Sequence, residues 1–305
     1  MDQATTSRAP PRRDLRDLPW LLMALTALFW AGNAVIGRAV AGEVPPIALA
    51  FWRWVTGAAI ILPFAWPHLR RDLRPMLRAW RVMLALSVLG IAVFNSTLYI
   101  AAQSTTALNI VMLQSTMPVL IVAASFLLFR ERVTGRQALG IAVSMAGAVT
   151  LVTRGDPGLL ARLDLNRGDI WMLGGIVSYS FYTALLRRRP AVHGLSFVAA
   201  TFMTGAALLL PFYLAETLAG RPLPLSPVAA GAILYVALFA SVLAYLCYNR
   251  AVALLGANTA GLAVHLVPVF GIILAVLLLG EVPRAYHAAG ILLIGTGIWL
   301  AQRRG

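Results

Sequence analysis

The side chains that could do chemistry in this sequence are a small polar and aromatic set that interrupts long apolar stretches. Its members are Trp30, Asn33, Asn95, Tyr99, Gln114, Ser115, Tyr179, Tyr182, Tyr245, Tyr248 and His265. Amide and imidazole groups hydrogen-bond carboxylates, and ring faces and amide oxygens accept ammonium groups. As a set, these residues fit a binding site for an amino acid or a similar small metabolite, although any single aromatic residue can also be an interface anchor or a packing group.

His265 is the one histidine well inside an apolar stretch, one turn before Pro268. An imidazole within a membrane needs a hydrogen-bond partner or water. We therefore expect His265 either to line a cavity or to be a satisfied packing residue. Because imidazole titrates near neutral pH, it is also the one candidate carrier of a coupled proton.

Pro118 and Pro268 lie near the centres of two apolar stretches. Inside a helix, each would leave the carbonyl four residues earlier, that of Gln114 or Val264, without its backbone donor. The prolines would then form either a static kink or a hinge that exposes polar backbone to a cavity. Their matched positions in the two halves favour gating hinges.

The eleven acidic residues all lie outside the middle of the apolar stretches. Strongly coupled carriers often keep a carboxylate there, so the sequence favours facilitated diffusion or weak coupling, with carbonyl-bound Na⁺ still compatible. No HExxH motif and no lysine is present, which argues against an intramembrane enzyme. We predict no catalytic residue, no metal and no cofactor. Glu131 and Glu281 are assigned to structure, as caps or as partners of nearby arginines such as Arg132, Arg136 and Arg284.

Composition indicates what must position these residues. Of the 305 residues, 60% are hydrophobic and 12% charged, with a mean hydropathy of +0.81. Such a chain cannot cover itself with water-facing groups and needs lipid as its solvent. The net charge of +14 does not indicate nucleic acid, because all 25 basic residues are arginine and nearly all lie outside the apolar stretches. That pattern is typical of membrane topology.

Ten apolar runs approach the roughly twenty residues that cross a bilayer. They span 18–37, 47–66, 82–102, 108–129, 137–153, 169–186, 195–215, 228–248, 259–279 and 286–302. They predict an all-α integral membrane protein whose longest connections are 67–81 and 154–168. With a cytoplasmic N-terminus, 18 arginines fall on the cytoplasmic side and six outside, so both termini should be cytoplasmic. Arg53 lies within a span, and we expect it near the outer interface or paired, outside the site.

The two halves of the sequence repeat. A shift of 150 positions aligns Ala107 with Ala257, Pro118 with Pro268, Glu131 with Glu281, Gly140 with Gly290, and Gly147 with Gly297. The same shift sets Ser115 opposite His265. Each half contains five predicted spans, so the halves enter the membrane in opposite orientations. Such an inverted repeat lets a central site open alternately to each side.

Several motifs in order carry a resemblance to a known family. They are Leu28-Phe29-Trp30-Ala31-Gly32-Asn33, Pro45-Pro46 with Arg53, the segment from Ala107 to Pro118, Arg130-Glu131 and Gly280-Glu281. Across 18–302 the chain resembles the EamA branch of the drug/metabolite transporter superfamily. The resemblance implies ten helices as a 5+5 inverted repeat. Its parts are a cytoplasmic tail (1–17), a first repeat (18–154), a periplasmic linker (155–168), a second repeat (169–302) and a C-terminal tail (303–305).

The same resemblance implies transport of a small metabolite in the bacterial inner membrane, with helices 1, 3, 4, 6, 8 and 9 around the cavity. Within the family, the chain is similar to bacterial exporters of aromatic amino acids, so we expect amino-acid export by alternating access. Efflux of drugs or quaternary amines, with His265 as proton carrier, is the alternative. The apolar helices lack the polar stripe of a channel.

The expected partners are the small-molecule substrate and the lipid bilayer, not nucleic acid. Small residues on helices 5 and 10, among them Gly140, Ser144 and Gly147 opposite Gly290 and Gly297, suit close helix packing or a dimer face. The sequence is therefore compatible with a monomer or a homodimer.

Overall fold

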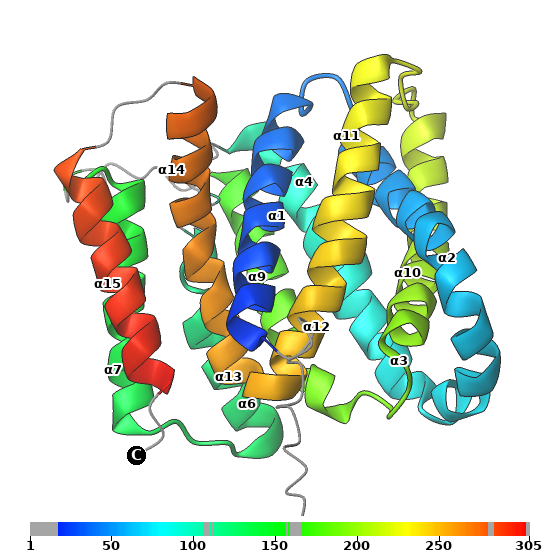
Figure 1. Cartoon of the computed structure of the whole chain (residues 1–305). Coiled ribbons are helices and arrows are strands. Elements are labelled where there is room, and N and C mark those ends of the chain that lie inside the picture. Colours follow the sequence, from blue (N-terminus) through cyan, green and yellow to red (C-terminus); the bar gives the residue numbers. More distant parts are fainter. Residues whose placement is uncertain are drawn as a thin grey trace, which may run out of the picture.

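The chain folds as a bundle of helices (Figure 1). This computed structural model describes residues 18–105, 110, 113–156, 158, 166–279 and 284–302. Within that part, six helices are long and apolar enough to cross a membrane: Pro19–Ala39, Pro46–Arg78, Trp80–Ser104, Gly135–Val152, Gly194–Leu218 and Pro227–Leu255. Met117–Phe129 and Ala285–Ala301 are shorter apolar helices. Ten crossings and their orientation stay predictions.

The first half begins with α1 (Pro19–Ala39) and α2 (Pro46–Arg78). An interrupted helix follows, made of α3 (Trp80–Leu86), the π-helical η2 (Ser87–Val93) and α4 (Phe94–Ser104). Two helices, α6 (Met117–Phe129) and α7 (Gly135–Val152), complete this half. Proline occupies the first turn of α1, α2 and α6, where a helix has no use for its missing N–H.

The second half has the same order. It contains α9 (Arg167–Leu185), the short η3 (Leu186–Arg188), α10 (Gly194–Leu218), α11 (Pro227–Ala237), the π-helical η4 (Leu238–Leu243), α12 (Ala244–Leu255), α13 (Ala257–Ala260), η5 (Gly261–His265), α14 (Leu266–Leu279) and α15 (Ala285–Gln302). Between α12 and α13, Gly256 has a φ of 81°, a backbone conformation that glycine adopts without steric cost.

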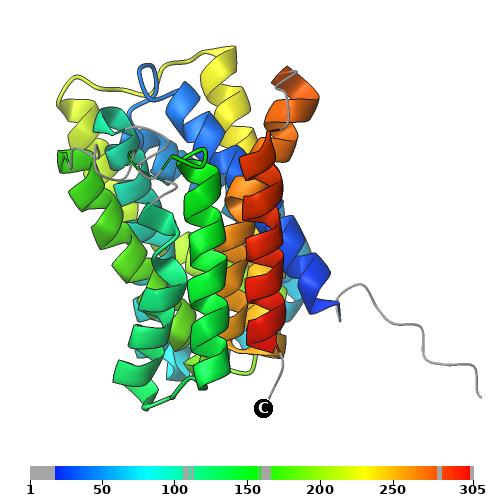
Figure 2. The same ribbon diagram turned by 90° about the vertical axis from the view of Figure 1, so that its left-hand side faces the viewer.

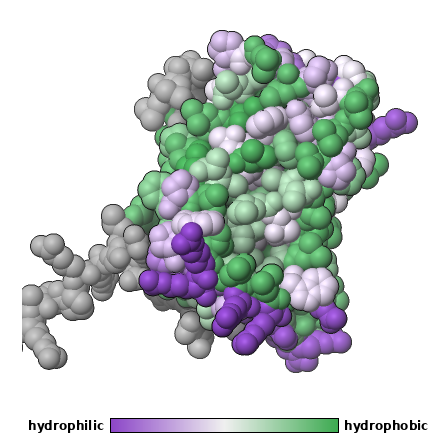
Figure 3. Space-filling model, turned by 90° about the vertical axis from the view of Figure 1, so that its right-hand side faces the viewer, coloured by the Kyte–Doolittle hydropathy of each residue, from purple (hydrophilic) through white to green (hydrophobic). Residues whose placement is uncertain are grey.

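The predicted connection at 67–81 is wrong, because α2 stays helical to Arg78 and α3 begins at Trp80. The helix even contains Pro63, Pro67 and Pro75. Arginines do not require a loop here, since their long stems let the charged head reach the membrane surface from an apolar helix. On the right-hand side of the molecule, hydrophilic side chains gather at the end where α2 stops, below a broad apolar band (Figure 3).

Pro118 and Pro268 each lie in the first turn of an α-helix, just after a change in the backbone hydrogen-bond pattern. Pro118 lies in the first turn of α6, directly after a turn at Ser115 and Thr116. Pro268 lies in the first turn of α14, directly after the 3₁₀ segment η5. The regular α-helical pattern of backbone hydrogen bonds thus gives way just before each proline, to a turn at 115–116 and to a 3₁₀ segment at 261–265, at matched places in the two halves. In the part of the predicted span 108–129 that precedes α6, residues 108, 109, 111 and 112 lie outside the described residues.

Helices α7 and α15 lie side by side within the chain (Figures 1 and 2). A Cβ added at Gly140 would come within 2.6 Å of the carbonyl oxygen of Gly297, and one at Gly147 within 2.7 Å of that of Gly290. The two backbones can approach this closely only because these side chains are absent. The predicted small-residue faces therefore form an interface between the two halves of one chain.

Candidate functional site

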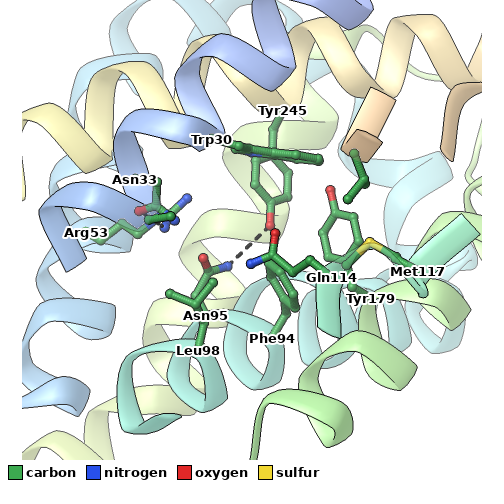
Figure 4. Close-up of a pocket in the computed structure, with 12 residues that line it drawn as sticks. Trp30, Asn33, Arg53, Phe94, Asn95, Leu98, Gln114, Met117, Tyr179 and Tyr245 are labelled. Atoms are coloured by element: carbon green, nitrogen blue, oxygen red, sulfur yellow. Dashed lines mark hydrogen bonds between the residues drawn. The ribbon is translucent and has the colours of Figure 1, made fainter. Parts of the chain in front are cut away.

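A narrow cavity lies at the centre of the bundle, where helices of both halves meet (Figure 4). It is lined by Trp30, Asn33, Ala34, Arg53, Phe94, Asn95, Leu98, Gln114, Met117, Tyr179, Tyr245 and Val264. These residues come from α1, α2, α4, α6, α9, α12 and the segments just before α6 and α14. The cavity has a volume of about 20 Å³, which is enough for one or two water molecules. The cavity is contracted in this conformation, because a typical ligand pocket occupies about 300–1,000 Å³.

Six of the residues selected from the sequence line this cavity, namely Trp30, Asn33, Asn95, Gln114, Tyr179 and Tyr245. The other five, Tyr99, Ser115, Tyr182, Tyr248 and His265, are buried behind the lining. They contact lining residues or one another. The structure thus brings the predicted set into one region and divides it into a lining and a supporting layer.

The cavity also contains a residue that the sequence analysis left outside the site, Arg53 of α2. Its side chain is 1% exposed and donates four hydrogen bonds. Nε bonds Ser241 Oγ at 2.6 Å, Nη1 bonds Asn33 Oδ1 at 3.1 Å and Tyr99 Oη at 2.8 Å, and Nη2 bonds the Ala240 carbonyl oxygen at 2.7 Å. Arg53 therefore ties α2 to α1, α4 and η4.

All four acceptors of Arg53 are neutral. Among the described residues, Arg187 pairs with Glu131, whereas no carboxylate is among the hydrogen-bond acceptors of Arg53. Sequence reasoning expected an interfacial or paired arginine, because a lone charge within a span is costly. The acceptors of Arg53 come from three distant parts of the chain, so the sequence could not indicate them. The sequence indicated only that a single arginine lies inside an apolar run.

The two ends of the cavity differ in chemistry (Figure 4). Arg53 and Asn33 lie together at one end. At the other end, the Tyr179 ring centroid is 4.6 Å from that of Phe94 and 5.6 Å from that of Trp30. The Tyr179 hydroxyl is buried and has no hydrogen-bond partner among the described residues. One end can thus bind an anion and the other an apolar or aromatic group that carries a polar atom.

A layer of tyrosines separates the aromatic end from a second, larger cavity. Tyr182 Oη donates to Asn249 Oδ1 at 2.8 Å, and the Tyr248 hydroxyl lies 3.0 Å from Thr183 Oγ1. Tyr248 also packs on Trp30, with ring centroids 5.1 Å apart. Asn249 in turn lines the larger cavity, so this layer is the barrier between the two spaces.

The larger cavity, which we call the basic vestibule, is lined by Arg187, Arg189, Glu131, Asn249, Gly256 and neighbouring residues. Its volume is about 540 Å³. Arg187 Nη1 pairs with Glu131 Oε2 at 2.9 Å, so Glu131 does not pair with Arg132 or Arg136 as the sequence suggested. Burial lowers the pKa of the Arg189 guanidinium, which nevertheless stays charged at neutral pH. Glu281 lies outside the described residues.

His265 bridges three segments behind the lining and is fully buried. Its Nε2 lies 2.9 Å from the Ser115 carbonyl oxygen, and its Nδ1 lies 2.7 Å from Ser144 Oγ. A carbonyl oxygen can only accept, so Nε2 carries a hydrogen, and in the neutral ring Nδ1 accepts from the Ser144 hydroxyl. Both ring nitrogens are thereby occupied, which gives His265 the contacts of a packing bridge.

Two contacts join residues that are equivalent in the repeat. Asn95 Nδ2 donates to Tyr245 Oη at 3.4 Å, and these residues are 150 positions apart, as are Ser115 and His265. Equivalent positions of two repeats can touch only near the axis that relates the repeats. The cavity, which Asn95 and Tyr245 line, therefore lies at the pseudo-twofold axis, where inverted-repeat carriers place their substrates.

The two π-helical segments also have carbonyl groups at equivalent positions of the repeat that bind residues of the cavity. The carbonyl oxygen of Gly90 in η2 accepts from Tyr245 Oη at 2.5 Å, and that of Ala240 in η4 accepts from Arg53. Gly90 and Ala240 are again 150 positions apart. A π-helical turn leaves backbone carbonyls available to side chains, and in each half that carbonyl binds a residue of the cavity. Among the described residues, no group of three or more His, Cys, Asp and Glu could hold a metal ion.

Comparison with known proteins gives a consistent result. The model of the EamA-like transporter family matches residues 18–153 and 166–302. An "Uncharacterized transporter" of Archaeoglobus fulgidus is 28% identical over 286 residues, covering 93% of this chain and 97% of that protein. "Inner membrane protein YtfF" of Escherichia coli is 25% identical, with 93% and 94% covered. A solved crystal structure superposes with a TM-score of 0.74 at 20% identity, covering 93% of this chain and 96% of the other, which shows a shared fold.

Proposed function

This chain belongs to the EamA-like transporter family, and on that basis we propose that it exports amino acids, preferentially aromatic ones, or closely related metabolites. The family and its inner-membrane relatives make the chain a multi-pass membrane transporter and not an enzyme. The substrate class, the direction and the mechanism are our proposal.

One observation carries the proposal. The cavity at the pseudo-twofold axis combines a cationic end with an aromatic end. An aromatic amino acid has a carboxylate for Arg53, with Asn33, Asn95 and Gln114 beside it, and a ring for Trp30, Phe94 and Tyr179. Amides and ring faces can accept its ammonium group.

The proposed mechanism is alternating access. In this conformation the cavity is too small for an amino acid, so binding requires the two halves to move apart around it. The irregular backbone just before Pro118 and Pro268, at matched positions, is a suitable place for hinges, since rocking of one repeat against the other needs two equivalent bends. Opening of the tyrosine layer would connect the cavity to the basic vestibule. Facilitated diffusion is the simplest mode of transport, because none of the described residues that line the cavity is acidic.

Counterflow in proteoliposomes tests this proposal. The purified protein is reconstituted and preloaded with each amino acid in turn, and uptake of the labelled amino acid is followed with and without a proton gradient. We expect aromatic amino acids to exchange fastest and the gradient to have little effect. Exchange of a quaternary amine but of no amino acid would refute the substrate assignment, and the cationic Arg53 in the lining disfavours that alternative.

A further inference from the structure

We propose that Arg53 is the anion-binding group of the cavity and that the site selects its substrate by the carboxylate, so that an aromatic monocarboxylate without an amino group is also a ligand. This inference rests on the proposed function. It replaces the amino-acid class by carboxylates with an apolar or aromatic side chain, with or without an amino group.

The positive charge of Arg53 is not balanced by a negative charge among the described residues around it. Arg53 is 1% exposed, and a buried ion costs several kcal/mol unless a counter-charge accompanies it. The four neutral acceptors hold the guanidinium in place without neutralising it. A monoanionic ligand supplies the missing negative charge, whereas a zwitterion leaves the site with its net positive charge.

Hydrogen-bond donors remain available for a ligand at the end of the cavity that contains Arg53. A guanidinium has five N–H donors, and those of Arg53 make four bonds to described residues, which leaves one N–H of Nη2 for a ligand. The Asn95 amide donates only one long bond, of 3.4 Å, to Tyr245, and Gln114 lines the same cavity. Charge-assisted N–H donors are the groups that bind carboxylates most strongly.

The cavity offers the ammonium group of an amino acid no charged partner among the described residues. None of the described residues that line the cavity is Asp or Glu, so the ammonium group of an amino acid would meet ring faces and amide oxygens at best. The unpartnered Tyr179 hydroxyl can bind a polar atom of the ligand, but it carries no charge. The amino group therefore contributes little affinity beside the carboxylate.

The approach to the cavity has the same charge preference. Among the described residues, Arg187 and Arg189 line the basic vestibule together with one acidic residue, Glu131, which pairs with Arg187 and leaves the positive charge of Arg189 in excess. A cleft of one dominant sign raises the local concentration of the opposite ion. Anions would thus be concentrated on the far side of the tyrosine layer, and organic cations would be repelled.

Competition in the counterflow assay separates these contributions on the unmodified protein. The labelled substrate is the amino acid that exchanges fastest, and the competitors are the same molecule without its amino group and without its carboxylate. For phenylalanine these are 3-phenylpropanoate and 2-phenylethylamine. We expect 3-phenylpropanoate to inhibit with a constant no higher than the KM of phenylalanine, and 2-phenylethylamine to inhibit at least about 30-fold more weakly, as loss of a charge-assisted bond requires.

Variants then assign the effect to Arg53. Arg53→Gln should raise the KM of the amino acid about 10- to 100-fold and abolish the preference for 3-phenylpropanoate, while Arg53→Lys retains it in part. Arg38→Gln is the matched control, since Arg38 donates to a main-chain oxygen of Ala102 at 2.7 Å outside the cavity. Tyr179→Phe removes a hydroxyl that has no described partner and should change the KM without affecting folding. Monodisperse elution of each variant in detergent shows that it is folded.

The outcomes distinguish the two proposals. Stronger inhibition by the amine than by the carboxylate, with the amino acid still exchanged, refutes the role of Arg53 and leaves the proposed function intact. If Arg53→Gln does not fold, the competition on the unmodified protein still decides. Absence of exchange for every amino acid, together with exchange of an organic cation, refutes both.

Discussion

Replacement of His265 by alanine should destabilise the protein and leave the KM for substrate unchanged. The substitution removes two buried hydrogen bonds, to the Ser115 carbonyl oxygen and to Ser144. Such bonds contribute about 0.6–1 kcal/mol each within membrane proteins, and the void left by the ring costs about 1–2 kcal/mol more. The total, roughly 2–4 kcal/mol, should lower the melting temperature of this chain in detergent by about 3–6 °C.

The measurement is thermal unfolding combined with counterflow kinetics. Ser144→Ala removes the Nδ1 contact alone and should show about a quarter of the His265→Ala effect on stability. A role in substrate or proton binding predicts the opposite pattern. If His265→Ala raised the KM tenfold, or removed a response to the proton gradient, without lowering the melting temperature, the bridging role would be refuted.

Three further perturbations have clear expectations. Gly140→Leu should cost at least about 2 kcal/mol by overpacking against α15, whereas Gly174→Leu, with no atom within 4 Å of its added Cβ, should be neutral; fluorescence-detected elution after heating compares the two. Glu131→Gln should change stability by less than about 1 kcal/mol, because its ion pair with Arg187 is exposed, and a melting-temperature shift above about 5 °C would contradict this. Asp169→Ala should cost about 2 kcal/mol, measured by the same unfolding assay, because its buried carboxylate accepts from Thr105 and from the backbone at the start of α9.

The helices were predictable because hydrophobic run length reports directly on membrane-spanning segments. A loop was wrongly predicted at 67–81 because several arginines there interrupt the apolar pattern. The helix nevertheless continues to Arg78, since the long arginine side chains can reach the membrane surface from it. The π-helical turns have no local sequence signature. They depend on tertiary partners such as the bond from Tyr245 to the Gly90 carbonyl oxygen.

For the site, residue type alone indicated which side chains gather, but not which of them face the cavity. Tyr179 and Tyr182 are three positions apart on α9, yet only Tyr179 lines it. Arg53 was missed for a different reason. Its four acceptors lie on α1, α4 and η4, and their convergence exists only after folding.

The contacts between equivalent positions of the repeat have a consequence for how such a protein can evolve. If two identical half-length chains formed this bundle as a dimer, the axis would require the same residue from both sides, asparagine against asparagine or tyrosine against tyrosine. In the joined chain, Asn95 meets Tyr245, and Ser115 meets His265. Covalent fusion thus frees each axis position to change independently, so a cavity that begins symmetric can acquire two chemically different ends.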